Sequence, residues 1–286
     1  MDGERQLTRI YSAAGRELRS LLLELDIENL NEMKAMEIEK HAKRVTFGLN
    51  LAAHRWAGRY LPGAYRAGAA RSRTALEILG RKPKPRFARP GSGPQAIVES
   101  ATTYLIKANG SMGRIVERYL SVALLARKTY SETSGLIQEF SFNDAAWWLS
   151  RFATAAVKAE QSRGDLKRRI LNYLRGLISD DNFIEIKGKM WRAGKYAELV
   201  ARTTLRDAQT KATKDLCAQY ENDLIQWSDH ATDCPICIEF EGKVYSLSGA
   251  TPGYPIIPEE PPAHPNCKHS LLPTSVEAIE ARARWS

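Results

Sequence analysis

The sequence has few cysteines and no long apolar run, and both scarcities restrict what the protein can be. Only four cysteines occur among 286 residues, and three of them fall in one short stretch, so a disulfide framework is disfavoured. No stretch of about 18 apolar residues occurs, so we expect no membrane span. The sequence opens MDGERQLTRI, which lacks an apolar core, so we expect no secretory signal. We therefore expect the protein to stay where it is made, unless it leaves inside a larger particle.

Apolar and charged residues are present in the proportions of a globular protein. Hydrophobic residues make up 43% of the chain and charged residues 26%, which is typical of folded domains. This apolar content is sufficient for a core, which excludes disorder of the whole chain. The length corresponds to about one to three domains.

The spacing of apolar residues predicts a mostly helical chain. Apolar positions recur every three or four residues over 3–25, 28–60, 96–130 and 190–220, the period of a helix with one buried stripe. We expect Pro62-Gly63 to interrupt the second stretch, leaving a shorter helix over 64–79 that ends at Gly80. Further predicted features are a break at Asn109-Gly110, a helix that Asn143 caps and that contains Trp147, Trp148 and Phe152, and another helix over 164–178.

The character of the sequence changes after Tyr220. Short segments rich in β-branched and aromatic residues, DLIQWSD, GKVYSLS, YPIIP and KHSLLP, are bounded by glycine and proline and predict short strands. A helix is expected over 275–284. The predicted fold class is mainly α, with long helices in the N-terminal two-thirds and a small β-rich C-terminal module. The predicted division is a basic helical region (1–80), a Pro/Gly/basic linker or arm (81–95), a helical domain (96–220) and the module (221–286).

Positive charge is concentrated in one part of the chain. The net charge is +9, yet residues 40–89 alone hold thirteen basic residues and one acid. Such a block favours a polyanionic partner, most simply nucleic acid bound through its phosphates without sequence readout. A solvated helix face, or a surface that meets an acidic protein, is the alternative. The candidate nucleic-acid-binding residues are Lys40, Lys43, Arg44, Arg71, Arg73, Arg81, Lys82, Lys84, Arg86 and Arg89.

Cysteines and histidines near the C-terminus have the spacing of a metal site. Two residues separate Cys234 from Cys237, which lets both sulfurs face one point at the zinc–sulfur bond length of about 2.3 Å. A second cluster, His264, Cys267 and His269, follows at a distance usual for the two halves of a small zinc module. The sequence therefore predicts structural zinc as the cofactor of a zinc-stapled module.

The fourth ligand is less clear than the three cysteines. His269 is preferred because it lies two residues beyond Cys267, at the start of a predicted strand. His264 is flanked by prolines and is a close alternative, and His230 is a weaker one. A redox dithiol or merely buried cysteines are the alternatives to zinc. A site with four protein ligands has no open position, so it is structural, and metal could supply much of the folding energy of so small a module.

Four motifs between residues 190 and 274 occur in a recognisable order. They are ARTTLRDAQTKA (201–212), a strand that ends in Trp before H-x-x-x-C-x-x-C, the strand GKVYSL, and HPNCKHSLLP. Together they resemble the C-terminal module of tailed-bacteriophage minor capsid or head-morphogenesis proteins. In that family the last motif commonly reads HPNCRC or HPNCRH, so Lys268 replaces an arginine here. Thr204 stands where the preceding helix often has an acid. Residues 1–180 carry no motif that can be assigned.

The resemblance implies a protein of the virion. Members of the family are associated with the portal vertex and are implicated in head assembly and in DNA packaging or ejection. By this resemblance the chain is made in the bacterial host cytoplasm and lies in the capsid interior or at the portal vertex, in several copies per particle. Its implied partners are the portal protein, the major capsid protein and packaged DNA, which would meet the basic residues through non-specific phosphate contacts.

Three other function classes were weighed. A nicking enzyme would use His264, Asn266 and His269, but it also needs a general base and an open metal position, and the sequence offers no separate carboxylate–histidine set. A zinc-containing DNA-binding regulator fits the basic block but lacks recognisable helix-turn-helix or finger spacing. A toxin-like transferase would require a catalytic motif between 96 and 190, where none is found. We therefore expect a structural protein rather than an enzyme, with a nuclease as the main enzymatic alternative.

Overall fold

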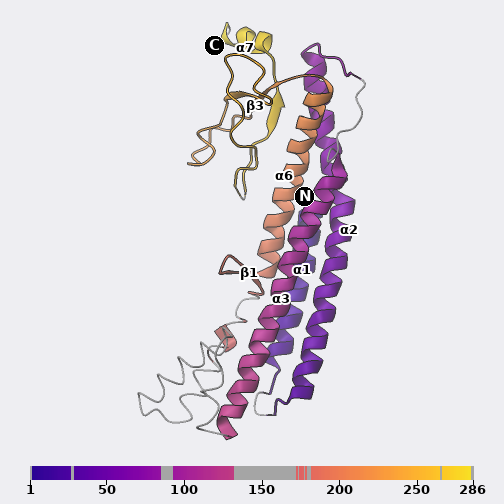
Figure 1. The fold of residues 1–286 in the computed structure, drawn as a ribbon, viewed down its shortest axis with the longest axis vertical. Helices are drawn as coiled ribbons and strands as arrows, with labels where there is room; N and C mark the ends of the chain where they lie inside the picture. Colours follow the sequence, from indigo (N-terminus) through magenta and orange to yellow (C-terminus); the bar gives the residue numbers. More distant parts are fainter. Residues whose placement is uncertain are drawn as a thin grey trace. The chain divides into compact units, whose positions relative to one another are not determined.

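The computed structural model describes residues 2–26, 29–84, 93–131, 172, 174–176, 178, 182–264 and 266–284, and most of them are helical. The long helices are α1 (Asp2–Leu23), α2 (Glu32–Ile78), α3 (Pro94–Ser131) and α6 (Ala193–Gln219). Five short strands and a last helix, α7 (Val276–Ala283), complete the described elements, which Figure 1 shows in chain order. The strands are β1 (Ile184–Ile186), β2 (Lys189–Trp191), β3 (Leu224–Trp227), β4 (Val244–Ser246) and β5 (Leu271–Pro273). The predicted class, mainly α with a small strand-containing C-terminal region, is confirmed.

The chain divides into two compact units, of which one comprises residues 6–52 and 105–197. In this unit α1 buries one stripe, because Leu7, Tyr11, Leu18 and Leu22 recur at helical spacing and are all inaccessible to solvent. On α3 the expected break at Asn109-Gly110 is wrong, since the helix is continuous there. The side chain of Asn109 is buried, and its Nδ2 atom donates to the Oδ1 atom of Asn50 on α2 at 2.7 Å. Tertiary packing thus keeps a weak helix former inside the helix.

A hairpin in the same unit escaped sequence prediction. Strands β1 and β2 pair antiparallel, with Ile186 opposite Lys189. The two residues between them, Lys187 and Gly188, both have positive φ, at 48° and 73°. Two left-handed residues are what a tight type I′ hairpin turn requires. The strands contain three residues each, too few for a period-2 pattern to stand out.

The second unit comprises residues 1–5, 53–104 and 198–286, and its helices α2 and α6 pack closely. A Cβ atom at Gly68 would lie 2.8 Å from the Cα atom of Gln209, so this approach requires glycine. Nearby, the buried hydroxyls of Ser72 and Thr213 share a hydrogen bond of 2.8 Å. Small residues and satisfied polar groups therefore set the distance between the two helices.

The predicted interruption of α2 at Pro62-Gly63 is wrong, because Pro62 lies inside a continuous helix. A proline there removes one helical N–H and crowds the carbonyl of Gly58, at a cost of about 3 kcal/mol. Leu61 and Leu76 are fully buried, and their burial on either side of Pro62 offsets that cost.

The end of α2 agrees with the sequence. Gly80 has a φ of 70°, the left-handed conformation that glycine adopts without strain. Its N–H donates to the carbonyl of Glu77 at 2.9 Å, and the Arg81 N–H donates to the carbonyl of Leu76 at 2.9 Å. These two bonds form the Schellman motif that a glycine after the last helical turn allows.

The C-terminal strands form one antiparallel sheet in the order β4-β3-β5. Three of the four predicted strand segments are confirmed, and so is the closing helix. The segment YPIIP instead makes a single parallel bridge, between Ile256 and Ser246. Trp227 is fully buried and lies within 5.0 Å of Phe240, centroid to centroid. Trp227 packs beneath the cysteine cluster, because it belongs to the same buried core as Cys237 and Cys267.

Several predictions lie outside the described residues. They are the helix with Trp147, Trp148 and Phe152, most of the helix over 164–178, and the linker residues 85–92. The division into four consecutive ranges therefore stays a prediction. None of the described helices combines the length and apolar character that crossing a bilayer demands.

Candidate metal centre

The first arm of the centre is a tight turn that follows β3. Within it, Cys237 and Ile238 donate their N–H groups to the carbonyl of Cys234 at 3.1 and 3.0 Å, and Phe240 donates to Cys237 at 2.9 Å. These successive turns curl the chain around the two cysteines, so that both sulfurs lie on the same side. The C-x-x-C pair thus has the local shape that metal binding requires.

The second arm is a proline-rich loop before β5. The Cys267 N–H donates to the carbonyl of His264 at 3.1 Å, which closes a tight turn between these two residues. Asn266 in that turn has a φ of 70°, a conformation that asparagine tolerates better than most residues. The turn directs His264 and Cys267 toward the first arm.

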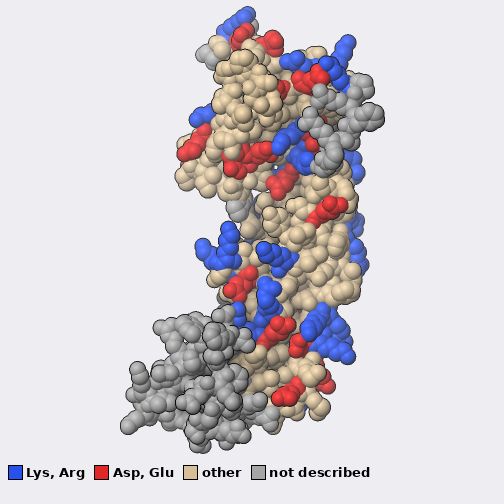
Figure 2. Space-filling model, in the orientation of Figure 1, with Lys and Arg blue, Asp and Glu red and all other residues tan. Residues whose placement is uncertain are grey.

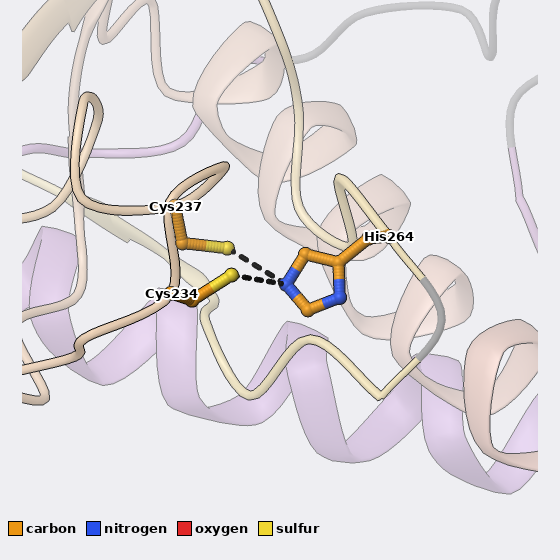
Figure 3. A group of neighbouring side chains, drawn as sticks. All are labelled: Cys234, Cys237 and His264. Carbon is orange, nitrogen blue, oxygen red and sulfur yellow. Dashed lines mark hydrogen bonds between the residues drawn. The ribbon is translucent and has the colours of Figure 1, made fainter.

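The ligand atoms of the two arms converge. The Nε2 atom of His264 lies 3.3 Å from the Sγ atom of Cys234 and 3.0 Å from that of Cys237, as the dashed lines in Figure 3 mark. The Sγ atom of Cys267 lies 3.7 Å from that of Cys237. Ligands bound at the zinc–sulfur and zinc–nitrogen lengths lie about 3.5–3.8 Å apart around a tetrahedral ion. The predicted residues therefore form groups that could hold a metal, with Cys237 shared between them.

His269 lies on the other side of Cys267. Its Nδ1 atom is 3.6 Å from the Sγ atom of Cys267, and its Nε2 atom is 3.0 Å from the Oε1 atom of Glu241. Both side chains are buried, with 3% and 10% of their surface exposed. Pairing of a buried imidazole with a carboxylate orients the ring. Glu241 also accepts hydrogen bonds from the N–H groups of His230 and Thr232.

The environment sets different pKa values within the cluster. Burial raises the pKa of the Cys237 thiol to about 12, and the neighbouring Cys267 thiol adds to this. The pKa of Cys234 lies below its usual value because the N–H groups of Cys237 and Ile236 donate to its sulfur. Desolvation raises the pKa of Glu241, but hydrogen bonds from His269 and the two N–H groups outweigh it, so the pKa is lowered. Burial and the neighbouring thiols disfavour the Cys237 thiolate, and a divalent cation bound by this sulfur would stabilise it.

The fourth cysteine has no part in the cluster. Cys217 is fully buried, and burial raises the pKa of its thiol to about 12. A buried thiol that holds its proton behaves as a small apolar side chain. Cys217 is therefore a residue of the buried core.

The predicted nucleic-acid-binding residues fall into two groups that belong to different units. Lys40, Lys43 and Arg44 are exposed on α2 in one unit, where Lys43 pairs with Glu39. In the other unit Arg73, Arg81 and Lys82 are exposed. Arg71 instead bonds the Gln209 side chain at 2.8 Å, and Lys84 pairs with Glu221. Arg86 and Arg89 lie outside the described residues.

Two residues of the centre were not found from the sequence. Glu241 is separated from His269 by 28 positions, and one glutamate among many carries no signal of such a pairing. Asn266 was noticed only as part of a nuclease-like cluster, whereas its side chain accepts a hydrogen bond from Arg202. Through this contact Arg202, on α6, reaches the loop of the second arm.

Comparison with known proteins gives one finding. Residues 175–285 match the model of a family described as phage minor capsid protein 2. The matched range contains α6, the sheet and all five predicted ligands. No curated protein and no solved structure matches the chain.

Proposed function

We propose that this chain, whose residues 175–285 match the model of the phage minor capsid protein 2 family, is a structural component of a phage capsid whose C-terminal module is held together by one zinc ion. The family supports a capsid role and a place in the virion. The observation that carries the zinc is the convergence of the Cys234 and Cys237 sulfurs with the His264 imidazole, together with the Cys267 sulfur, which lies 3.7 Å from that of Cys237.

The chemistry of the ligands favours zinc over other common ions. Thiolate and imidazole ligands at tetrahedral spacing suit zinc, whereas magnesium and calcium prefer oxygen ligands. A small module also gains most from such an ion. The core around Trp227 contains seven buried residues, three of them cysteines, and so small an apolar core supplies little stability by itself.

We propose Cys234, Cys237, Cys267 and His264 as the four ligands. His264 is favoured over the sequence preference, His269, because its Nε2 atom lies near two sulfurs at once. The Nε2 atom of His269 is paired with Glu241, so His269 could bind the ion only through Nδ1, and the one sulfur among the described residues to which a contact of Nδ1 is seen is that of Cys267, at 3.6 Å. In this assignment His269 packs beside Cys267 and keeps that arm in place. Four protein ligands leave no position for a substrate or a reactive water, so the proposed role of the ion is structural.

We propose that α2 contacts packaged DNA. Four arginines, Arg55, Arg59, Arg66 and Arg73, are exposed and recur at intervals of four and seven residues, which places them on one side of the helix. None of these four forms an ion pair with a residue in the part of the chain that the structure describes. Figure 2 shows lysine and arginine side chains at several heights along the edge where α2 runs. Such a stripe fits a phosphate backbone and carries no base readout.

We propose further that the chain lies in the capsid interior or at the portal vertex, in several copies. A basic helix and a rigid metal-stapled module suit a protein between shell, portal and DNA. Co-expression with the portal protein of the same phage tests this. The two proteins are expected to purify as one complex at moderate salt. Separate elution at every salt concentration would overturn portal association but leave the capsid role standing.

A further inference from the structure

Four side chains of α6 contact the loop that carries part of the proposed zinc site. Arg202, Arg206, Thr210 and Lys214 follow one another at intervals of four residues, so they form one band along the helix. Each of them contacts the loop that carries the second arm, residues 259–264 and 266–268, here called the ligand segment. We refer to these four residues as the α6 clasp.

The contacts of the clasp cover the ligand segment from one end to the other. Arg202 donates to the Oδ1 atom of Asn266 through Nη1, and Arg206 donates to the carbonyl of Lys268 at 2.7 Å. The Thr210 hydroxyl donates to the carbonyl of Pro261 at 2.7 Å. Lys214 forms an ion pair with Glu260. Cys267 therefore lies between two residues that arginines of α6 hold.

The ligand segment needs such donors because of its composition. Pro261 and Pro262 have no N–H group, so this part of the chain cannot form a regular strand ladder. Its carbonyl groups must find partners elsewhere, and the clasp supplies two of them. The Trp227 indole N–H supplies another by donating to the carbonyl of Glu259 at 3.3 Å. Without these donors the segment would lose the contacts that give it one conformation.

Arg202 also connects the clasp to the start of the chain. Its Nη2 atom lies 2.7 Å from a carboxylate oxygen of Glu4 and 2.8 Å from one of Glu198. Two carboxylates hold the guanidinium in place, and the remaining donor is directed at Asn266. A fixed guanidinium is a better anchor than a mobile surface arginine.

From this geometry we infer that Arg202 and Arg206 are positioning residues for the metal: they hold Asn266 and Lys268 on either side of Cys267 and so keep His264 and Cys267 where the ion needs them. The inference rests on the proposed zinc site. By linkage, metal binding and docking of the ligand segment on α6 strengthen each other by the same factor. Removal of the ion should therefore loosen the segment from α6, and removal of the arginines should weaken metal binding.

The test compares native protein with the double variant Arg202→Gln/Arg206→Gln, using the full chain. Zinc affinity is measured by competition with a chromophoric chelator, and hydrogen exchange of amides in 259–268 is followed with and without zinc. We expect the double variant to bind zinc about 10-fold more weakly, the usual effect of losing groups that support metal ligands, and to exchange faster in 259–268. Helical circular dichroism confirms that both proteins are folded. The matched control, Arg16→Gln/Arg19→Gln, removes two exposed arginines of α1 and should behave as native.

The outcomes separate the clasp from the zinc site itself. Equal zinc affinity and equal exchange in the native protein and the double variant would overturn the clasp and leave the zinc site intact. Absence of zinc binding by the native protein would overturn the zinc site. In that case the hydrogen exchange of residues 259–268 still tests whether the α6 clasp holds the ligand segment. Faster exchange in the double variant would support the clasp, and unchanged exchange would contradict it.

Discussion

The Nε2 atom of His264 lies 3.0 Å from the Sγ atom of Cys237, although 27 residues separate the two positions in the chain. This approach is the reason why we propose His264 rather than His269 as the fourth ligand. We predict one zinc per chain for the native protein, as measured by elemental analysis after dialysis against a weak chelator. His264→Ala should lose nearly all of it. His269→Ala should retain zinc with an affinity lower by about 10-fold, since it supports the site without binding the ion.

The reverse pattern would make His269 the fourth ligand. Retention of zinc by both variants would show that the ligand set itself is wrong. Cys234→Ser is the positive control, because it removes a sulfur that belongs to the proposed set on either assignment.

A second prediction concerns the packing of α2 on α6. Gly68→Ala places a methyl group 2.8 Å from the backbone of Gln209, so we expect it to destabilise the protein by about 1–3 kcal/mol. The control is Gly48→Ala on the same helix, where nothing lies within 4 Å of the added methyl group. Alanine is the better helix former, so the control should be stabilised by about 0.5–1 kcal/mol. Thermal unfolding followed by circular dichroism measures both, and equal shifts for the two variants would contradict the close approach.

A third prediction concerns the loop after β4, which Asp223 holds. Its carboxylate accepts hydrogen bonds from the hydroxyls of Ser246, Ser248 and Thr251 and from the Ser248 N–H. Although desolvation acts to raise the pKa of Asp223, these bonds lower it well below its usual range. A lowered pKa gives stability that is present above the unfolded-state pKa of about 3.9 and lost only as the pH falls below it.

Asp223→Asn should therefore lower the midpoint of thermal unfolding by the same amount at pH 7 and at pH 5, with a loss of about 1–2 kcal/mol. Zinc-loaded native and variant proteins are compared at each pH. Glu280→Gln, an exposed position on α7, serves as the charge-matched control and should change little. If the difference in unfolding midpoint between native protein and Asp223→Asn is present at pH 7 but absent at pH 5, the lowered pKa of Asp223 is contradicted.

Some parts of the molecule could be predicted from the sequence and others could not. The Cys-x-x-Cys pair and the cluster from His264 to His269 were identifiable because metal ligands come at local spacings. Helix periodicity likewise placed α1 and α6. Pro62 and Asn109 were misjudged because local propensity favours a break at both, whereas burial of their neighbours and contacts with other helices decide the outcome. The contact between Arg202 and Asn266 and the pairing of Glu241 with His269 were missed, because the partners lie 64 and 28 positions apart in the chain.

A fourth prediction concerns DNA. The triple variant Arg59→Gln/Arg66→Gln/Arg73→Gln should weaken binding to duplex DNA of any sequence. It should also reduce the slope of log Kd against log salt by about 2–3, since each lost phosphate contact removes about 0.9. Fluorescence anisotropy over a range of salt concentrations measures both. Arg5→Gln/Arg16→Gln/Arg19→Gln removes the same charge from exposed positions of α1 and should leave the slope closer to native. Equal slopes for the two triple variants would show that the stripe on α2 is not the contact surface.

The proposed capsid role is tested most directly by quantitative mass spectrometry of purified, DNA-filled particles from the source that encodes this chain. The account predicts that the chain is present at a few copies per particle, together with coat and portal proteins, and that it stays with the particles through a density gradient. Absence of the chain from every particle preparation would contradict its proposed place in the virion.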